Sequence, residues 1–593
     1  MTIGESCQLD KLNFSSLSRL SSLSTLENKR EHDGSCQLFK LERISSIPVS
    51  SEKDKREEQT EPKMDSDPLI HRPTSAVDHR SRPISRSSTG GWTSALFIIG
   101  VELAERSSYY GISLNLITYL TGDLGESTAS AAAGVNTWYG VSQMMPLLGA
   151  FVADSYFGRY WTIAVASLFY VLGLGLLTLS AILPNLNKQL QVILFYFSLY
   201  LVAFAQGGHK PCVQAFGADQ FDERDPQERI SRSSFFNWWY FGMNAGMMVS
   251  LLVLTYVQDN ISWGLGFGIP CILMVIALAV FLMGTKSYRY YLLEDESPFV
   301  RIGRTFTILI KSNFITKEGE SRHLHGDDES NRLNEHGDEL SIRLAEEARG
   351  VLRLFPIWAT CLGYAVVFAQ SPTFFTKQGA TMDRRIGSTF QVPPAALQSL
   401  TCVAILAFIP IYARIIVPIS RNISKRPSGL TPLQRIGTGL IVSITLMVVS
   451  ALVEIRRLKT AQEFGLIDRP DVMIPMSIWW LVPQYILLGI CDVFTMVGLQ
   501  EFFYDQVPDA LKSLGLALYL SIFGIGNFIS SFLVSVIDGV TKSAGESWFS
   551  NNLNHAHLDY YYWLLAGLSA VVFVIYMYSA QSYVYKKIGS GAL

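Results

Sequence analysis

The stretch at residues 101–111, reading V-E-L-A-E-R-S-S-Y-Y-G, places three charged residues in the middle of an otherwise apolar segment. Read as a helix, it sets Glu102 and Arg106 four residues apart in the favourable acid-to-base order. Glu105 and Tyr109 fall on the same face. A charge at the centre of a bilayer costs about 2.5 to 3.5 kcal/mol, so three of them facing lipid would cost roughly 7 to 10 kcal/mol. These side chains must therefore face protein or water.

Apolar residues elsewhere gather in long blocks. Of 593 residues, 49% are hydrophobic and 17% are charged, whereas a soluble domain has roughly 25% charged residues. A helix needs about 18 or more mostly apolar residues to cross a bilayer. Twelve such windows, some of them short, can be drawn at 92–120, 135–152, 161–183, 192–204, 235–256, 263–283, 351–368, 397–416, 436–453, 478–494, 514–536 and 561–578. We therefore predict an all-α membrane protein with twelve transmembrane helices.

Charge and cysteine usage exclude several classes of protein. The formal net charge of -2 gives no case for nucleic acid as a partner. The seven cysteines are odd in number and lack metal-ligand spacing, so they read as core residues without a disulfide framework or a metal site. No phosphate-binding loop of the form G-x-x-x-x-G-K-[ST] is present, which disfavours nucleotide-driven pumping. We therefore expect no enzymatic activity and no cofactor, with a gradient supplying the energy.

Two polar regions divide the chain. Residues 1–90 are rich in Ser, Arg, Lys and Glu and have no signal-peptide pattern, which predicts a disordered cytosolic tail. Residues 286–348 form a second polar region that separates the windows six and six. We therefore expect a six-helix bundle at 91–285, a cytosolic linker at 286–348 and a second six-helix bundle at 349–593.

Basic residues in the loops indicate the orientation. With an even number of spans both termini share a side, which also holds the arginine-bearing turns at 158–159, 223–232 and 420–426. Cytosolic loops carry an excess of Lys and Arg, so we place both termini in the cytosol. Basic residues assigned to the opposite loops are Arg384, Arg385, Arg456 and Arg457.

The tail carries two candidate regulatory signals. Asp65, Leu69 and Ile70 resemble an acidic dileucine sorting signal, which would bring contacts with a sorting adaptor. Ser85 lies between arginines and is a candidate phosphorylation site for a kinase. A solvated Ser/Arg linker is the alternative. The plasma membrane and the vacuolar membrane both stay open as locations.

The charge cluster of the first span can act as a switch. Arg106 favours the ionised form of the Glu102 carboxylate, whereas burial favours its protonated form. If a substrate anion takes Arg106 as its partner, the released carboxylate is left desolvated and takes up a proton. Proton binding would then be coupled to substrate binding. The alternative is a buried ion network that only pins helices together.

Two further spans carry charges. Lys210 lies in a mostly apolar stretch and needs an acidic partner, for which the first-span glutamates are candidates. Pro211 after it predicts a broken helix that lines a cavity; the alternative is a lysine that reaches the membrane interface. His209 titrates near neutral pH when exposed, but a lone histidine is more often packed. In the tenth span, Asp492 and Glu501 are candidates to face the same cavity, and an interfacial cap is the alternative for Glu501.

Several motifs together resemble a known family. Asp154, Gly158 and Arg159 form the pattern D-x-x-x-G-R between the second and third spans, which resembles the signature loop of the major facilitator superfamily. E-x-x-E-R in the first span, G-G-x-K-P-C-V-Q-A-F-G-A-D-Q-F-D after the fourth and F-F-N-W-W-Y-F in the fifth resemble the proton-dependent oligopeptide transporter group. E-F-F-Y-D-Q-V-P at 501–508 and H-L-D-Y-Y-Y-W at 557–563 are similar to its plant branch, the nitrate and peptide transporter (NPF) family.

The resemblance covers residue 91 to the end and implies the major facilitator superfamily fold, with two six-helix bundles around a central cavity and alternating access. It implies a proton-coupling role for Glu102, Glu105 and Arg106, with Lys210 as partner. Asn244 matches the asparagine that contacts substrate in the peptide-transporting relatives. Candidates for structural or gating roles are Asp154, Gly158, Arg159 and Asp219.

Departures from the family pattern leave the substrate open. Tyr109 and Tyr110 resemble the tyrosine pair of peptide carriers, yet Ser113 stands where many bacterial ones have a second arginine. Phe368 stands where the dual-affinity nitrate carrier has a nitrate-binding histidine. Other matched positions are Asp492, which replaces a glutamate, and Thr162, which matches a phosphorylated threonine but also suits an ordinary helix start.

We therefore expect a proton-coupled symporter of a small solute, nitrate or a di- or tripeptide, working in the lipid bilayer by alternating access. The candidate substrate-binding residues are Arg106, Tyr109, Tyr110, Lys210, Asn244, Phe368, Asp492 and Glu501. The alternatives are a membrane sensor of the same solute without net flux, a uniporter with purely structural glutamates, and a carrier of a plant hormone or specialised metabolite.

Overall fold

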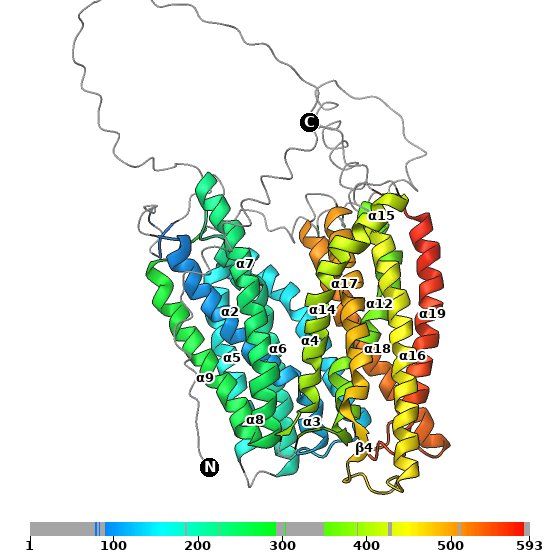
Figure 1. The fold of residues 1–593 in the computed structure, drawn as a ribbon. Coiled ribbons are helices and arrows are strands. Elements are labelled where there is room, and N and C mark those ends of the chain that lie inside the picture. The colour runs from blue at the N-terminus through cyan, green and yellow to red at the C-terminus, as the bar shows by residue number, and fades with distance from the viewer. Residues whose placement is uncertain are drawn as a thin grey trace, which may run out of the picture. The chain divides into compact units, whose positions relative to one another are not determined.

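The long apolar windows of the sequence form helices in the computed structural model (Figure 1). The structure describes residues 77–79, 82, 89–183, 187–222, 225–291, 303, 307, 349–387, 390–424, 430–507 and 512–585. All of them belong to the unit Pro68–Leu593.

The first half of this unit is a bundle of long helices joined by short turns. Helices α2, α5, α6, α7 and α9 pack on one another, and α4 packs on α5 and α6. Its elements are α2 (Gly91–Ser113), α3 (Leu116–Thr121), α4 (Thr128–Val152), the π-helix η2 (Ala153–Phe157), α5 (Gly158–Ile182), α6 (Lys188–Ala218), α7 (Pro226–Val249), the π-helix η3 (Ser250–Leu254), α8 (Thr255–Asn260), α9 (Trp263–Met283) and the 3-10 helix η4 (Gly284–Lys286).

The second half is also a helical bundle, in which α12 packs on α18 and α19 and α16 packs on α17 and α19. Its helices are α12 (Phe355–Phe368), η6 (Ser371–Phe375), α13 (Thr376–Ala380), η7 (Pro394–Gln398), α14 (Ser399–Ile411), η8 (Tyr412–Ile416), α15 (Val417–Ser424), α16 (Pro432–Glu463), η9 (Ile478–Leu481), α17 (Val482–Asp505), α18 (Lys512–Ala544) and α19 (Leu558–Ser582). Its strands are β1 (Met382–Asp383), β2 (Arg385–Ile386), β3 (Phe390–Gln391) and β4 (Ile474–Ser477), of which β1 pairs with β4 in parallel and β2 with β3 antiparallel.

The predicted membrane helices are confirmed. Nine continuous helical runs among the described residues are long and apolar enough to cross a membrane. One of them, Thr128–Ile182, holds two predicted windows joined through η2. Helix α2 is not among the nine because it carries three charges, and α12 because it has only 14 residues before the chain turns into η6. All the predicted windows therefore lie on helices.

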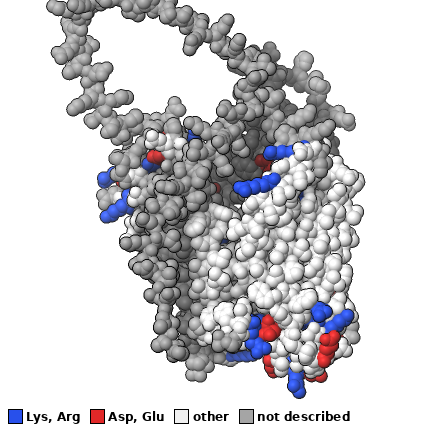
Figure 2. Space-filling model, viewed as in Figure 1, with Lys and Arg blue, Asp and Glu red and all other residues white. Residues whose placement is uncertain are grey.

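The surface has the character of a membrane protein. Figure 2 shows a wide band of uncharged side chains on the viewed face, with Lys, Arg, Asp and Glu at its two ends. Large apolar side chains stand exposed in such positions, among them Leu406 at 65%, Phe532 at 67% and Val574 at 67%. Contiguous exposed apolar surface of this kind is rare on soluble monomers. A surface of this kind is suited to contact with the hydrocarbon core of a lipid bilayer.

We name the two ends of the bundles by what lies there. The linker end holds the start of α2, the end of α9 and α15; the β4 end holds α3, α8 and β4 (Figure 1). Several hydrogen bonds between the two bundles gather toward the β4 end. They join Lys377 Nζ to Thr121 Oγ1 at 2.7 Å, Gln398 Nε2 to the carbonyl of Leu114 at 3.2 Å, and the Thr128 amide to Asn551 Oδ1 at 3.0 Å.

Two expectations about helix limits were wrong. Helix α6 runs unbroken through Pro211. The carbonyl four residues earlier, Gly207 O, lies where α4 comes so close that a Cβ on Gly149 would be 2.0 Å from it, and neighbouring helices stabilise proline in membrane helices in this way. Helix α16 extends to Glu463, so Arg456 and Arg457 both lie inside the helix and are no loop residues. Arg457 is fully buried, whereas Arg456 is exposed.

Candidate functional site

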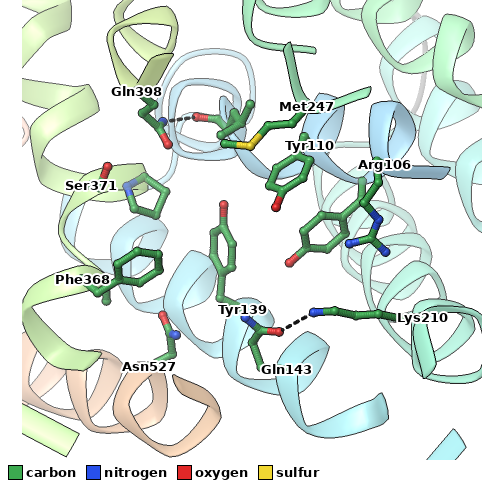
Figure 3. Close-up of a pocket in the computed structure, with 14 residues that line it drawn as sticks. Arg106, Tyr110, Tyr139, Gln143, Lys210, Met247, Phe368, Ser371, Gln398 and Asn527 are labelled. Atoms are coloured by element: carbon green, nitrogen blue, oxygen red, sulfur yellow. Dashed lines mark hydrogen bonds between the residues drawn. The ribbon is translucent and has the colours of Figure 1, made fainter. Parts of the chain in front are cut away.

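A cavity of about 160 Å³ lies between the two bundles (Figure 3). Helices α2, α4, α6 and α7 line it on one side, and α12, η6, η7 and α18 line it on the other. Its lining residues are Arg106, Tyr109, Tyr110, Leu114, Tyr139, Gln143, Lys210, Met247, Phe368, Ala369, Ser371, Pro372, Gln398 and Asn527. Both halves of the chain therefore contribute to one site.

The charge cluster of α2 forms the wall of this cavity. Arg106 Nε lies 3.2 Å from Glu102 Oε1 and donates to Glu105 Oε2 at 2.5 Å, and Arg106 Nη2 forms an ion pair with Glu105. The hydroxyl of Tyr170 donates to Glu105 Oε1 at 3.2 Å. Glu102, Glu105 and Arg106 are all buried, but only the arginine lines the cavity. One helical face thus presents the cation to the cavity with its two carboxylates behind it.

The two glutamates differ in how well their oxygens are paired. Both oxygens of Glu105 accept hydrogen bonds. Glu102 Oε2 is buried and accepts no hydrogen bond of ordinary geometry among the described residues, although the Trp239 indole lies close enough to interact with this carboxylate. A buried carboxylate oxygen without a donor loses its hydration without compensation. Glu102 is therefore the carboxylate of the cluster that is best placed to receive a proton.

Lys210 also reaches the cavity, but with a partner that differs from the expected one. Its Nζ donates to Gln143 Oε1 at 3.0 Å (Figure 3), where an acidic first-span partner had been expected. Neighbouring His209 is fully buried, and both of its ring nitrogens lack a hydrogen-bond partner among the described residues. The ring centres of His209 and Tyr170 lie 6.3 Å apart in an edge-to-face arrangement. His209 is therefore a packed residue, which was one of the two expectations from the sequence.

The charged groups that line the cavity are both positive. Arg106 and Lys210 are its two charged lining residues, and no Asp or Glu is among the described residues that line it. The remaining polar groups are tyrosine hydroxyls, amides and one serine. Both cations can contact an anion in the cavity directly, whereas the carboxylates that balance them, Glu102 and Glu105, lie behind Arg106.

Aromatic and amide side chains fix the shape of the cavity. Tyr109 stacks on Trp138 at 5.5 Å, and the Arg106 guanidinium lies 5.6 Å from the Tyr109 ring centre. The Tyr139 hydroxyl donates to the carbonyl of Ser113 at 3.1 Å. Asn527 donates to the carbonyl of Phe523 at 2.8 Å. The cavity wall is therefore held in place by contacts within and between helices.

Three candidate substrate residues lie outside this lining. Asn244 is exposed on α7 and its amide donates back to the carbonyl of Tyr240 at 2.8 Å. Asp492 is buried and accepts a hydrogen bond from the Tyr364 hydroxyl. Glu501 lies 3.7 Å from Arg435 Nη1 near the linker end. Of the predicted set, Arg106, Tyr109, Tyr110, Lys210 and Phe368 line the cavity.

The signature loop joins helices at the linker end. Arg159 forms an ion pair with Asp219 at the end of α6, and its Nε lies 3.9 Å from Asp154 Oδ1. Gly158 has φ 72°, a left-handed conformation that suits glycine. Burial raises the pKa of the Asp219 carboxyl, and Arg159 partly offsets this rise. Thr162 donates to the carbonyl of Gly158 at 2.9 Å and is 8% exposed.

Some neutral lining residues were not predicted from the sequence: Tyr139, Gln143, Met247, Ser371, Gln398 and Asn527. None of them carries a charge, so the energetic argument that singles out the charged residues does not apply to them. The predicted sorting residues Asp65, Leu69 and Ile70 and the candidate phosphorylation site Ser85 lie outside the described residues.

Comparison with known proteins gives consistent matches. The family model described as the POT family matches residues 160–549. Protein NRT1/PTR FAMILY 5.10 of Arabidopsis thaliana is 58% identical over 536 residues, which cover 86% of this chain and 96% of that protein. Protein NRT1/PTR FAMILY 5.13 of the same plant is 53% identical over 545 residues, covering 86% and 97%.

Solved structures support the fold. The crystal structure of an auto inhibited POT family peptide transporter matches with a TM-score of 0.66 and 23% identity, covering 84% of this chain and 99% of that one. The POT family transporter PepTSo matches with a TM-score of 0.65 and 22% identity, covering 83% and 98%.

Proposed function

The chain belongs to the POT family of multi-pass membrane transporters, and from this premise we propose that it is a proton-coupled symporter of a small anion. It is not an enzyme. The family acts on small solutes together with protons. We further propose that substrate binds in the cavity between the bundles and moves by alternating access, without a cofactor.

The charge of the residues that line the cavity is the observation that favours an anionic substrate. Arg106 and Lys210 line the cavity, and no carboxylate lines it among the described residues. A di- or tripeptide carries an amine as well as a carboxylate, and the amine would face this wall without a carboxylate partner. Burying an unpaired charge is costly. Nitrate or an organic carboxylate therefore fits better than a peptide.

The apolar part of the wall supports a second candidate substrate. Leu114, Met247, Phe368 and Pro372 line the cavity beside the cations. A carboxylate with an apolar body, such as a plant hormone or a specialised metabolite, would place the body against these side chains. Nitrate has no such body, so the panel of substrates must include both kinds of anion.

Proton coupling follows from the sharing of Arg106. The guanidinium is held by Glu102 and Glu105 and also faces the cavity. A substrate anion at the cavity face competes with these carboxylates for the guanidinium. Glu102 Oε2 already accepts no hydrogen bond of ordinary geometry among the described residues, so Glu102 takes up a proton as its attraction to Arg106 weakens. Substrate and proton then travel together, and the bound charges are compensated.

For the orientation we propose that the linker end faces the cytosol. The arginine-bearing turn at 158–159 lies at that end, as the positive-inside rule expects of a cytosolic loop. The plasma membrane and the vacuolar membrane remain the two candidate locations, and sorting-adaptor and kinase contacts through residues 65–85 remain proposals. A fluorescent fusion with Leu69→Ala and Ile70→Ala tests the sorting signal, and an unchanged distribution would contradict it.

Uptake in oocytes tests the proposed function. Nitrate, a dipeptide, an aliphatic carboxylate and an aromatic carboxylate are offered separately at acidic and neutral external pH, with water-injected oocytes as control. We expect accumulation of an anion that is stronger at acidic pH. Accumulation of the dipeptide alone would contradict the proposal that the substrate is an anion. Protein that reaches the surface without accumulating any substrate would favour a sensor.

A further inference from the structure

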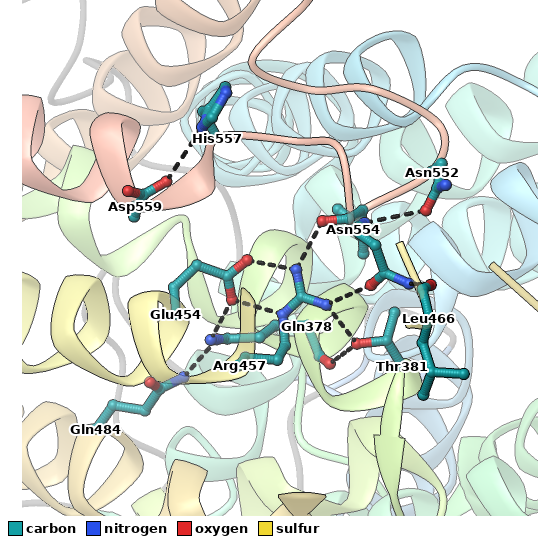
Figure 4. Close-up of polar contacts among 11 residues, drawn as sticks. Gln378, Thr381, Glu454, Arg457, Leu466, Gln484, Asn552, Asn554, His557 and Asp559 are labelled. Carbon is teal, nitrogen blue, oxygen red and sulfur yellow. Dashed lines mark hydrogen bonds and ion pairs between the residues drawn. The ribbon is translucent and has the colours of Figure 1, made fainter. Parts of the chain in front are cut away.

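A second buried ion pair lies at the β4 end, far along the chain from the α2 cluster (Figure 4). Arg457 and Glu454, both in α16, are completely buried. Arg457 Nε donates to Glu454 Oε2 at 2.8 Å, and Nη2 donates to Oε1 at 2.5 Å. Gln378 of α13 adds a hydrogen bond to Glu454 Oε2 at 2.7 Å. Both carboxylate oxygens of Glu454 therefore accept hydrogen bonds, whereas in Glu102 only Oε1 is paired, with Arg106.

The remaining N–H groups of the guanidinium contact three residues in two other segments. Nη1 donates to Thr381 Oγ1 at 3.3 Å and to Asn554 Oδ1 at 2.9 Å, and Nη2 donates to the carbonyl of Leu553 at 2.7 Å (Figure 4). With the two bonds to Glu454, these contacts use all the N–H groups that an arginine has. Arg457 therefore ties α16 to the end of α13 and to the chain between α18 and α19.

The chain between α18 and α19 depends on such side-chain contacts. Residues 545–557 form no helix or strand. Asn554 Nδ2 donates to the carbonyl of Leu466 at 2.8 Å, and Asn552 Nδ2 donates to the carbonyl of Ile467 at 2.7 Å. Arg457 adds two further bonds to the same chain. These side-chain bonds, together with the buried side chain of Leu553, hold residues 551–554 in place.

Asn551 of this chain reaches the other bundle. Its Oδ1 accepts a hydrogen bond from the Thr128 amide at 3.0 Å. Thr128 is the first residue of α4, and the Ser127 side chain caps the Ser130 amide of the same helix at 3.2 Å. The first amides of a helix lack partners within it. Asn551 thus supplies, from the opposite bundle, a cap that α4 does not provide itself.

We propose that Arg457, held by Glu454, is a positioning residue that places Asn551 against the start of α4 and so latches the two bundles at the β4 end. This inference rests on the proposed alternating access, because the latch must open when the cavity faces the β4 end. Arg457 keeps all its own contacts within one bundle. Among the bonds that join the bundles at this end, the one that Arg457 positions is the bond between Asn551 and Thr128. Losing one such bond shifts an equilibrium about two- to tenfold.

A proline at position 128 removes the latch without removing the helix. Thr128→Pro deletes the amide donor, and proline suits the first position of a helix. The preceding residue, Ser127, has φ -63° and ψ 148°, which proline allows in the residue before it. Thr128→Ala keeps the amide and is the matched control. Arg457→Lys keeps the charge beside Glu454 but cannot reproduce the fork of contacts.

Distances between the bundles give the readout. Lys188 of the first bundle and Asp471 of the second are both exposed at the β4 end and can be replaced by spin labels. Electron paramagnetic resonance then measures the distance between the two labels in the full chain in nanodiscs. A longer distance reports opening at this end. We expect Thr128→Pro to raise the population of longer distances about two- to tenfold over Thr128→Ala. Arg457→Lys should shift it in the same direction. In the double variant, the population of longer distances should be the same as in Thr128→Pro alone.

Three results would overturn the inference. The first is equal distance distributions for Thr128→Pro and Thr128→Ala. The second is an additive effect of Arg457→Lys on Thr128→Pro, which would mean that Arg457 acts elsewhere. If Arg457→Lys does not fold, Asn554→Ala takes its place. The third result would then be an additive effect of Asn554→Ala on Thr128→Pro. The measurement needs no substrate or proton gradient, so its failure is distinct from a failure of the proposed transport.

Discussion

Replacing Glu102 by Gln tests whether the α2 cluster couples protons to substrate. Arg106 Nε lies 3.2 Å from Glu102 Oε1, so at an effective dielectric constant of about 20 their attraction is about 5 kcal/mol before desolvation is subtracted. Gln keeps the size of the side chain and removes this attraction, while Glu105 still pairs with Arg106. The variant should therefore fold, with one carboxylate on Arg106 in place of two.

The charge balance predicts what the variant keeps and what it loses. Glu102, Glu105, Arg106 and Lys210 carry two negative and two positive charges, net zero; the substitution leaves one negative and two positive, net +1. An anion should bind at least as tightly, so its apparent KM should not rise. Wild-type uptake should fall by up to about tenfold per pH unit where Glu102 is ionised. Uptake by Glu102→Gln should not change with pH.

The assay is uptake of the transported anion in oocytes at stepped external pH, normalised to surface protein. Glu126→Gln is the control, because this glutamate also belongs to the first bundle and is hydrogen-bonded there, accepting from Tyr196 OH at 2.9 Å, but lies at the β4 end. It should keep the wild-type pH dependence. A Glu102→Gln profile that runs parallel to the wild type would refute the coupling mechanism.

Three further substitutions test the cavity, the helix crossing and the buried pair. Lys210→Gln should raise the apparent KM about ten- to a hundredfold, because a hydrogen bond to a charged group contributes about 1.5 to 3 kcal/mol; concentration-dependent uptake measures it, and an unchanged KM would exclude Lys210 from the site. Gly149→Leu should abolish the monodisperse peak in size-exclusion chromatography, because its Cβ would lie 2.0 Å from a backbone oxygen of α6; an unchanged peak would contradict that crossing. Arg457→Leu should destabilise the fold by about 3 to 5 kcal/mol by leaving the Glu454 charge unpaired, and adding Glu454→Leu should recover part of it; equal thermal unfolding of the single and double variants would count against this.

The membrane helices and the α2 cluster could be predicted because their free energies are large. Long apolar windows are most stable as helices in the hydrocarbon core of a bilayer. Each of Glu102, Glu105 and Arg106 would cost about 2.5 to 3.5 kcal/mol if it faced lipid. Their spacing also placed them on one helical face, and the structure pairs them there. These arguments use only neighbours along the chain.

The rest depends on how helices approach and rotate. Sequence spacing could not show that Gln143 of α4 reaches Lys210, or that Asp492 turns toward Tyr364 and away from the cavity. Neutral lining residues such as Asn527 carry no energetic signal. Arg457 was assigned to a loop because the apolar window ends before it, whereas Glu454 and two further segments stabilise it inside the helix.

Uptake by the purified chain in proteoliposomes tests the central claim, coupled movement of a proton and a small anion, most directly. Labelled nitrate, carboxylates and a dipeptide are offered with and without an imposed inward proton gradient, in the presence and absence of a protonophore. The proposed mechanism predicts that an anion accumulates above equilibrium only with the gradient and that the protonophore abolishes this accumulation. Anion accumulation that persists in the protonophore, or accumulation of the dipeptide alone, would contradict it.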